Sequence, residues 1–178
     1  MRAHYPLCRL YALKSSGDLC KMKALKALIL ACAIVLSVPY PVAADDASVI
    51  TACLREHSEK GKDAHACVGR VAEPCMETPD GQSTQGMVAC SQREMKIWDG
   101  LLNEAYQRLL KGLKPEAAED VRKAQRIWLT LRDADCRVPY YFYNGGTIVQ
   151  VLGAGCLLDH TAERAILIRS WRDMAEER

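Results

Sequence analysis

Six cysteines constrain the fold of this chain most, because they follow a segment that is typical of exported proteins. They are Cys53, Cys67, Cys75, Cys90, Cys136 and Cys156. An even number of cysteines in an exported chain indicates a set of disulfides. Six cysteines allow many pairings, and the sequence alone does not choose among them. We expect the sequential pairs, Cys53–Cys67, Cys75–Cys90 and Cys136–Cys156, in which each bond closes a short local segment.

The export segment begins at Met22. Two basic residues, Lys23 and Lys26, precede an apolar run over residues 27–38, and small residues follow before Asp45. This order is the pattern of a secretory signal with its cleavage site. The apolar run is too short and too one-sided for a stable membrane span.

Residues 1–44 are therefore expected to be a signal peptide with an over-extended start, the true start being Met22. The rest of the chain, 45–178, is expected to be a single domain in the periplasm or outside the cell. A lipoprotein anchored at Cys32 is not expected, because the apolar run continues past that cysteine.

Removal of the signal changes the charge of the chain. Six of the 24 basic and one of the 22 acidic residues lie before position 45, so 18 basic and 21 acidic residues remain, with a net charge of −3. Nucleic-acid binding would call for a basic face, and none is evident. We therefore expect no nucleic-acid partner.

Helical spacing dominates the remaining sequence. Residues 45–71 are expected to form two short helices around a polar turn, and residues 76–87 a polar loop held at its base by disulfide bonding. A long helix is expected over residues 87–111, where Trp98 and Leu102 belong to a stripe of apolar residues three and four positions apart.

A second long helix is expected from Pro115 towards Pro139, and a last one over residues 147–174. Four aromatic residues, Tyr140 to Tyr143, lie between them. No stretch alternates as a strand does. The sequence therefore predicts an all-α fold: a helical hairpin or small bundle of two to three long helices, with a short N-terminal helical hairpin, stapled by disulfides.

One face of the second long helix carries Gln125, Trp128, Arg132 and Cys136, at spacings of three and four. Most simply they form a packed and hydrogen-bonded seam, although a binding role is the alternative. Arg132 then needs a carboxylate. Its candidate partners on the other helices are Asp99, Glu104 and Asp159. Gln125 is expected to bond Asn103 across the helix pair.

Catalysis and metal binding are not expected. The histidines after the signal, His57, His65 and His160, stand in no nucleophile motif, and phosphate-binding or dinucleotide motifs are missing. Cys53, His57, His65 and Cys67 are the residue types of a zinc site. Because an oxidising compartment pairs the thiols, we expect disulfides there instead. No cofactor is predicted.

Three blocks carry a family resemblance: "WDGLLNEAYQRLL" after Cys90, "AQRIWLTLRDADC" from Ala124, and "GGTIVQVLGAGCLLDHTAERAILI" from Gly145. In this order they resemble the lysozyme-inhibitor LprI-like family, over about residues 53–169. The resemblance implies an exported helical domain. The positions that it marks as scaffold are Trp98, Asn103, Tyr106, Gln125, Trp128, Arg132, Asp133, Thr161 and Arg164.

Two functions are expected, neither of them enzymatic. The first, which the resemblance implies, is inhibition of a lysozyme-type glycosidase by filling its cleft with a rigid projection. The second is an adaptor or structural module that binds another envelope protein or peptidoglycan. Candidate partner-binding residues are Tyr140, Tyr141, Phe142 and Tyr143, because tyrosine is favoured at binding surfaces. The alternative for these four is a satellite core beneath the helix end.

Overall fold

The structure is a computed structural model that describes residues 45–177. The expected signal peptide, the start at Met22 and Cys32 lie outside the described residues.

All regular secondary structure between residues 45 and 177 is helical, and no strand occurs there. The elements in chain order are α2 (Asp46–Glu59), the 3-10 helix η1 (Ala64–Cys67), α3 (Ala72–Met76), α4 (Thr84–Gly112), α5 (Pro115–Asp135), α6 (Pro139–Phe142) and α7 (Ile148–Glu176). This arrangement confirms the predicted all-α fold. None of these helices is long and apolar enough to cross a membrane.

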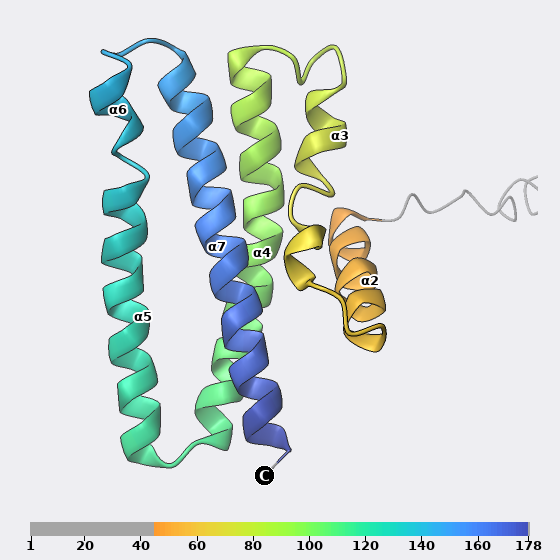
Figure 1. Ribbon diagram of the computed structural model, residues 1–178, viewed down its shortest axis with the longest axis vertical. Helices are drawn as coiled ribbons and strands as arrows, with labels where there is room; N and C mark the ends of the chain where they lie inside the picture. The colour runs from red at the N-terminus through yellow and green to blue at the C-terminus, as the bar shows by residue number, and fades with distance from the viewer. Residues whose placement is uncertain (1–44, 178) are drawn as a thin grey trace, which may run out of the picture. The chain divides into compact units, whose positions relative to one another are not determined.

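The two longest helices, α4 and α7, form the centre of the fold. They run in the same direction along most of their length (Figure 1). Large buried side chains on α4, Trp98 and Leu102, belong to one core with small residues on α7, Ala162 and Ala165. Small side chains allow the helices to approach closely while the large ones fill the space between them.

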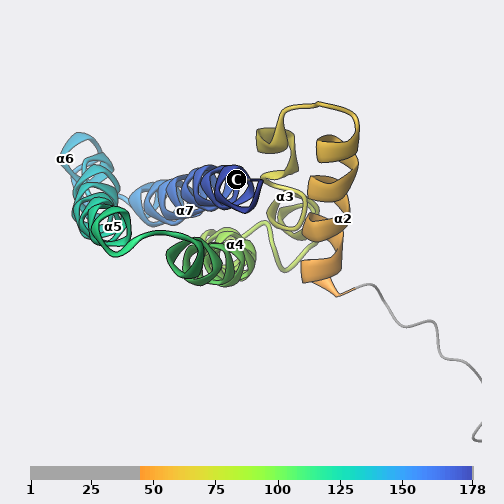
Figure 2. The ribbon, with the colours of Figure 1, turned by 90° about the horizontal axis from the view of Figure 1, so that it is seen from below.

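The shorter elements flank this pair on two sides (Figures 1 and 2). On one side lie α2, η1 and α3, and on the other lie α5 and α6. Helix α5 runs back antiparallel to α4 and α7, and Ala118 is its only residue that is fully buried. The helix that connects α4 to α7 is therefore the least embedded of the three long ones.

Three disulfides tie the flanking elements, two of them to the central pair and one within the N-terminal side. Cys53–Cys67 joins α2 to η1, Cys75–Cys90 joins α3 to α4, and Cys136–Cys156 joins the end of α5 to α7. Each bond links cysteines that are neighbours in the order of the sequence. Disulfides of this kind stabilise a fold mainly by limiting the freedom of the unfolded chain.

Three N-terminal details differ from the expectation. The second short helix of the N-terminal hairpin is the four-residue 3-10 helix η1, and a further short helix, α3, forms between that hairpin and the expected loop, over residues 72–76. Helix α4 begins at Thr84, earlier than expected, because the Ser83 hydroxyl oxygen accepts a hydrogen bond of 2.9 Å from the Gly86 N–H. Gly86 fits there because a Cβ would collide with the Asp80 carbonyl oxygen.

Candidate partner-binding surface

The aromatic segment between α5 and α7 forms a braced corner. Helix α5 ends at Asp135, and the next residue, Cys136, is bonded to Cys156 of α7. Pro139 then opens α6 at a position where a helix tolerates a missing N–H. The corner is therefore tied to α7 by a covalent bond at its base.

A tight turn closes the corner on its other side. Asn144 and Gly145 both have positive φ, 44° and 78°, a conformation that asparagine and glycine adopt most readily. The Gly146 N–H then donates a hydrogen bond of 2.9 Å to the Tyr143 carbonyl oxygen. This turn sends the chain directly into α7, so the four aromatic residues occupy a short and defined loop.

Three of the four aromatic side chains, Tyr140, Tyr141 and Phe142, play two different parts. Tyr140 is half-exposed, and its ring lies against Gly153 of α7: a Cβ at that glycine would lie 3.6 Å from the Tyr140 Cε2 atom. Tyr141 and Phe142 are 81% and 74% exposed. They do not form a satellite core, because fully packed rings would be excluded from water. Tyr140 anchors the corner, whereas Tyr141 and Phe142 are presented to solvent.

Exposed apolar side chains also occur on the two helices that the corner joins. Four of them belong to α5 and the start of α7: Ile127, Leu131, Ile148 and Leu152. Together with Tyr141 and Phe142 they are what we call the α6 surface. Isolated exposed apolar residues are normal, so the two adjacent exposed rings of the corner are what make this surface a candidate interaction site.

A hollow of about 590 Å³ lies beside Tyr140 of α6. Its polar lining comprises Gln92 of α4, Asp133 of α5, Arg137 and Tyr140 at the corner, and Gln150 of α7. Amide and guanidinium groups in such a hollow can hydrogen-bond to a partner that covers the neighbouring apolar residues.

Arg164 holds α5 against α7 from inside the fold. Its carbon Cζ lies 5.7 Å from the ring centroid of Trp128 on α5 and 5.4 Å from that of Trp171 on α7. Its Nε donates a hydrogen bond of 2.9 Å to the Oε1 of Gln125, and its buried Nη2 has no hydrogen-bond partner among the described residues. Burial lowers the pKa of the Arg164 guanidinium from its ordinary value. Cation–π contacts with the two rings compensate part of this burial.

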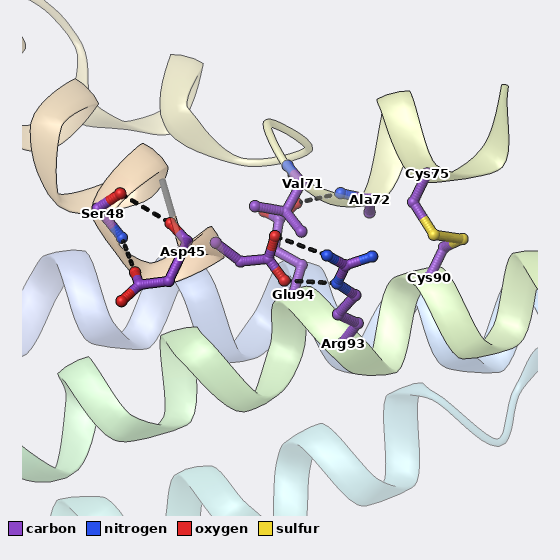
Figure 3. A network of polar contacts seen from close by, with 9 residues as sticks. Asp45, Ser48, Val71, Ala72, Cys75, Cys90, Arg93 and Glu94 are labelled. Atoms are coloured by element: carbon purple, nitrogen blue, oxygen red, sulfur yellow. Dashed lines mark hydrogen bonds and ion pairs between the residues drawn. A yellow bond between two sulfur atoms is a disulfide. The ribbon is translucent and has the colours of Figure 1, made fainter. Parts of the chain in front are cut away.

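A second internal polar group, Glu94 of α4, attaches α3 to the central pair (Figure 3). Its side chain is fully buried. One carboxylate oxygen accepts hydrogen bonds of 2.8 and 2.7 Å from the backbone N–H groups of Val71 and Ala72. The other accepts bonds of 2.7 Å from the Gly69 N–H and 2.9 Å from the Trp98 indole N–H. A carboxylate at the start of α3 satisfies N–H groups that the helix itself leaves free.

Glu94 is not among the residues that the sequence predicted to be functional or structural. A glutamate in a long amphipathic helix is usually expected on the side that faces solvent. The available signal was its spacing of four from Trp98, which places it on the apolar stripe of α4.

Two clusters have the composition of metal sites, and both contain disulfide-bonded cysteines. Cys53, His57 and Cys67 lie close together, as do Cys136, Cys156 and His160. Thiolates are the sulfur ligands that zinc requires, and these sulfurs are bonded to one another. Neither cluster can therefore supply cysteine ligands while it is oxidised.

Comparison with known proteins identifies the family. The family described as "Lysozyme inhibitor LprI" matches residues 75–166, which is half of the chain. The chain belongs to the LprI family. The matched region extends from Cys75 through α4, α5 and α6 into α7, so it includes Glu94, the α6 surface and Arg164.

A relative of this LprI-family chain is an uncharacterized protein of Rhizobium meliloti (strain 1021). It is 25% identical over 100 residues, which cover 49% of this chain and 72% of the relative. No solved structure matches the chain.

The structure brings together four of the positions that the LprI resemblance marks. Gln125, Trp128, Arg132 and Arg164 form one cluster between α5 and α7, and the Arg132 Cζ lies 5.1 Å from the Trp128 ring centroid. Trp98 and Thr161 are buried in the fold, and Tyr106 is partly buried against the core. The Thr161 hydroxyl donates to the Leu157 carbonyl oxygen at 2.7 Å.

Two expected pairings within this LprI chain were wrong. Arg132 does not pair with Asp99, Glu104 or Asp159: its Nη2 lies 2.8 Å from the Oδ1 of Asp133, the next residue in the chain. Gln125 does not bond Asn103, because its Oε1 accepts from Arg164 and the Asn103 Nδ2 donates to Asp99 at 3.0 Å. Gln125 and Arg132 lie with Trp128 beside Arg164 of α7, so they do not reach Asp99, Glu104 or Asn103 of α4. Asp159 belongs to α7, but Arg132 pairs within its own helix instead.

Proposed function

We propose that this LprI-family protein is an exported inhibitor that occludes the cleft of a lysozyme-type glycosidase with the α6 surface. The observation that carries the proposal is the pair Tyr141 and Phe142, 81% and 74% exposed on a corner that the Cys136–Cys156 disulfide fixes. In this proposal the chain binds an enzyme and catalyses no reaction itself.

The shape and chemistry of the corner suit this role. A glycosidase of this kind acts with two carboxylates in a cleft that admits a sugar chain. A convex projection can enter such a cleft, and aromatic side chains supply contact area with little loss of conformational freedom. Because α6 is short and braced on both sides, little ordering is needed when it binds, which lowers the free-energy cost of association.

A second segment lies at the same end of the α4/α7 pair as α6 (Figure 1). It is the loop of residues 77–83 between α3 and α4, whose base is tied by Cys75–Cys90. Within it, the Thr78 hydroxyl oxygen accepts a hydrogen bond of 3.1 Å from the Gly81 N–H. We propose this loop as the polar flank of the same contact, beside the apolar α6 surface.

The experiment that tests the function is an inhibition assay. The full chain would be expressed with export, purified in its oxidised form and added to lysozymes of several classes acting on a cell-wall suspension. We expect a dose-dependent loss of clearance with at least one class, and restored clearance after the disulfides are reduced. Lack of inhibition of every class at a large molar excess would contradict the proposal.

The same assay separates inhibition from the adaptor role. An adaptor that contacts another envelope protein through the α6 surface would leave lysozyme activity unchanged. If inhibition occurs, its dependence on salt tells how much of the contact is charged, because ion pairs at a protein surface weaken as ionic strength rises whereas apolar contacts do not.

A further inference from the structure

A hollow of about 310 Å³ lies between α2, α4 and α7, on the side of the central pair away from α6. Its floor includes core residues, among them Leu54 and Ala105. A second hollow, of about 270 Å³, adjoins it, and the two share Leu54, Ile166 and Arg169. Together they form a groove between α2 and α7, with Arg169 at the point where the two hollows meet.

Three arginines line the first hollow, and two of them already have carboxylate partners. The Arg108 Nη2 lies 2.8 Å from the Glu176 Oε1, and the Arg172 Nη2 pairs with the Asp173 carboxylate. These pairs neutralise most of the charge of the two side chains. The remaining positive charge of the hollow belongs to Arg169.

Arg169 is partly buried and makes no hydrogen bond or ion pair with any other residue of 45–177. It lies beside the apolar side chains of Leu54 and Ile166. A guanidinium that has lost part of its hydration is stabilised by an anion, and a carboxylate matches its planar pair of N–H donors. Arg169 is therefore the arginine of this hollow whose guanidinium has no carboxylate partner among residues 45–177, so a carboxylate of a ligand can pair with it.

The rest of the lining narrows the class of ligand. Glu104 is at the rim, 4.0 Å from Arg108, and disfavours a second negative charge on the ligand. Its carboxylate oxygens, and the oxygen of the Thr51 hydroxyl, can accept hydrogen bonds from hydroxyl or amide groups. These features fit a small monocarboxylate that carries hydroxyl groups.

We propose that this groove is a binding site for a sugar acid, with the sugar-acid carboxylate on Arg169 and its hydroxyl or amide groups near Glu104 and Thr51. The site is concave, so it cannot enter a glycosidase cleft as α6 can, and it lies apart from the α6 surface. It would give the protein a second activity: binding of a sugar acid whose carboxylate is free. This inference does not depend on inhibition of a lysozyme.

The test uses N-acetylmuramic acid, which differs from N-acetylglucosamine by one ether-linked lactyl carboxylate. The ¹⁵N-labelled, oxidised protein would be titrated with each sugar and with lactate, and amide shifts followed by NMR. We expect saturable shifts in α2 and α7 with N-acetylmuramic acid, none with N-acetylglucosamine, and binding of lactate at least tenfold weaker. Tenfold corresponds to about 1.4 kcal/mol.

Two variants assign the site. Arg169→Gln removes the proposed contact, and we expect it to weaken binding of N-acetylmuramic acid at least tenfold. The matched control is Arg55→Gln, which removes an exposed arginine of α2 that lines neither hollow and should bind as the unaltered protein does.

Three results would overturn the proposal. They are equal binding of both sugars, equal binding of lactate and N-acetylmuramic acid, and no saturable shift with any probe. The first two compare ligands on the unaltered protein, so they hold even if Arg169→Gln fails to fold. Because no lysozyme is present, failure here leaves the inhibition assay unaffected.

Discussion

The Glu94 carboxylate accepts a hydrogen bond of 2.7 Å from the backbone N–H of Ala72, so a side chain of α4 caps the start of α3. The same group is fully buried and also bonds the Trp98 indole. Buried carboxylates are costly unless their oxygens are well satisfied. Here the four donors come from two parts of the chain, so this one residue joins the N-terminal elements to the central helix pair.

Glu94→Gln should destabilise the fold. The substitution removes the negative charge and places an NH₂ group against backbone N–H donors, which leaves buried donors unsatisfied. We expect a loss of about 3 kcal/mol in the free energy of unfolding, measured by urea denaturation of the oxidised protein. The matched control, Glu77→Gln, changes an exposed glutamate of the loop and should have almost no effect. Equal effects of the two substitutions would show that the Glu94 network does not stabilise the fold.

Arg164→Lys should weaken the attachment of α5 to α7. A lysine keeps the charge but loses the planar group that contacts Trp128 and Trp171 and bonds Gln125. We expect the free energy of unfolding to fall by about 1–2 kcal/mol. The control is Arg126→Lys, an exposed arginine on the same side of the helix pair. If the two lysine variants are equally stable, the cluster contributes nothing that depends on guanidinium geometry.

Removal of the Cys136–Cys156 disulfide should abolish inhibition through a local effect. Helix α5 is little embedded, so the pair Cys136→Ser and Cys156→Ser would release the α6 corner. We expect a loss of about 2–4 kcal/mol in stability, faster hydrogen exchange in residues 139–146 and retained helicity of α4 and α7. The matched pair Cys53→Ser and Cys67→Ser frees α2 from η1 and should retain inhibition. Retained inhibition in the first pair would show that bracing of the corner is not required.

The stability of the fold should depend on pH through the carboxyl group of Asp159. Desolvation, and then the negative charge of Glu163, raise the pKa of the Asp159 carboxyl above its usual 3.8. Its ionisation therefore opposes folding as the pH rises above 3.8, and does so fully once the pH exceeds the raised pKa. Asp159→Asn should be more stable than the unaltered protein at neutral pH, by less than about 1 kcal/mol because the group is exposed and solvent screens it. The difference should vanish below pH 3.8. The stabilities would be measured by urea titration from pH 3 to pH 7, and a difference that stays constant over this range would contradict the assignment. The control is Asp80→Asn, in the α3–α4 loop.

Much of the fold followed from local patterns. The stripe that includes Trp98 and Leu102 predicted α4, and Pro115 and Pro139 marked the start of α5 and the segment after its end, because apolar spacing and proline act within one helix. The family resemblance is also confirmed. The start of α4 at Thr84 was missed although Ser83 is a typical cap, because the Gly86 beside it favoured a loop.

Contacts between helices were harder to predict. A chain of three long helices suggests that neighbours in sequence pair, yet α4 lies mainly against α7. Which helices pair depends on how the side chains of different helices fit together. Ala162 and Ala165 by themselves do not show which helix packs against them. The same limit explains the wrong partners for Arg132 and Gln125. It also explains why Glu94 was missed, since its bonds to Val71 and Ala72 exist only after α3 has packed on α4.

The most direct test of the account compares two variants in the lysozyme assay. The double variant Tyr141→Ala and Phe142→Ala removes the exposed rings, and Leu167→Ala removes an exposed apolar side chain of α7 away from the corner. We predict that the double variant loses at least a hundredfold in inhibitory potency, about 2.7 kcal/mol, with an unchanged urea midpoint, and that Leu167→Ala inhibits normally. Full inhibition by the double variant would show that the α6 surface does not bind the enzyme.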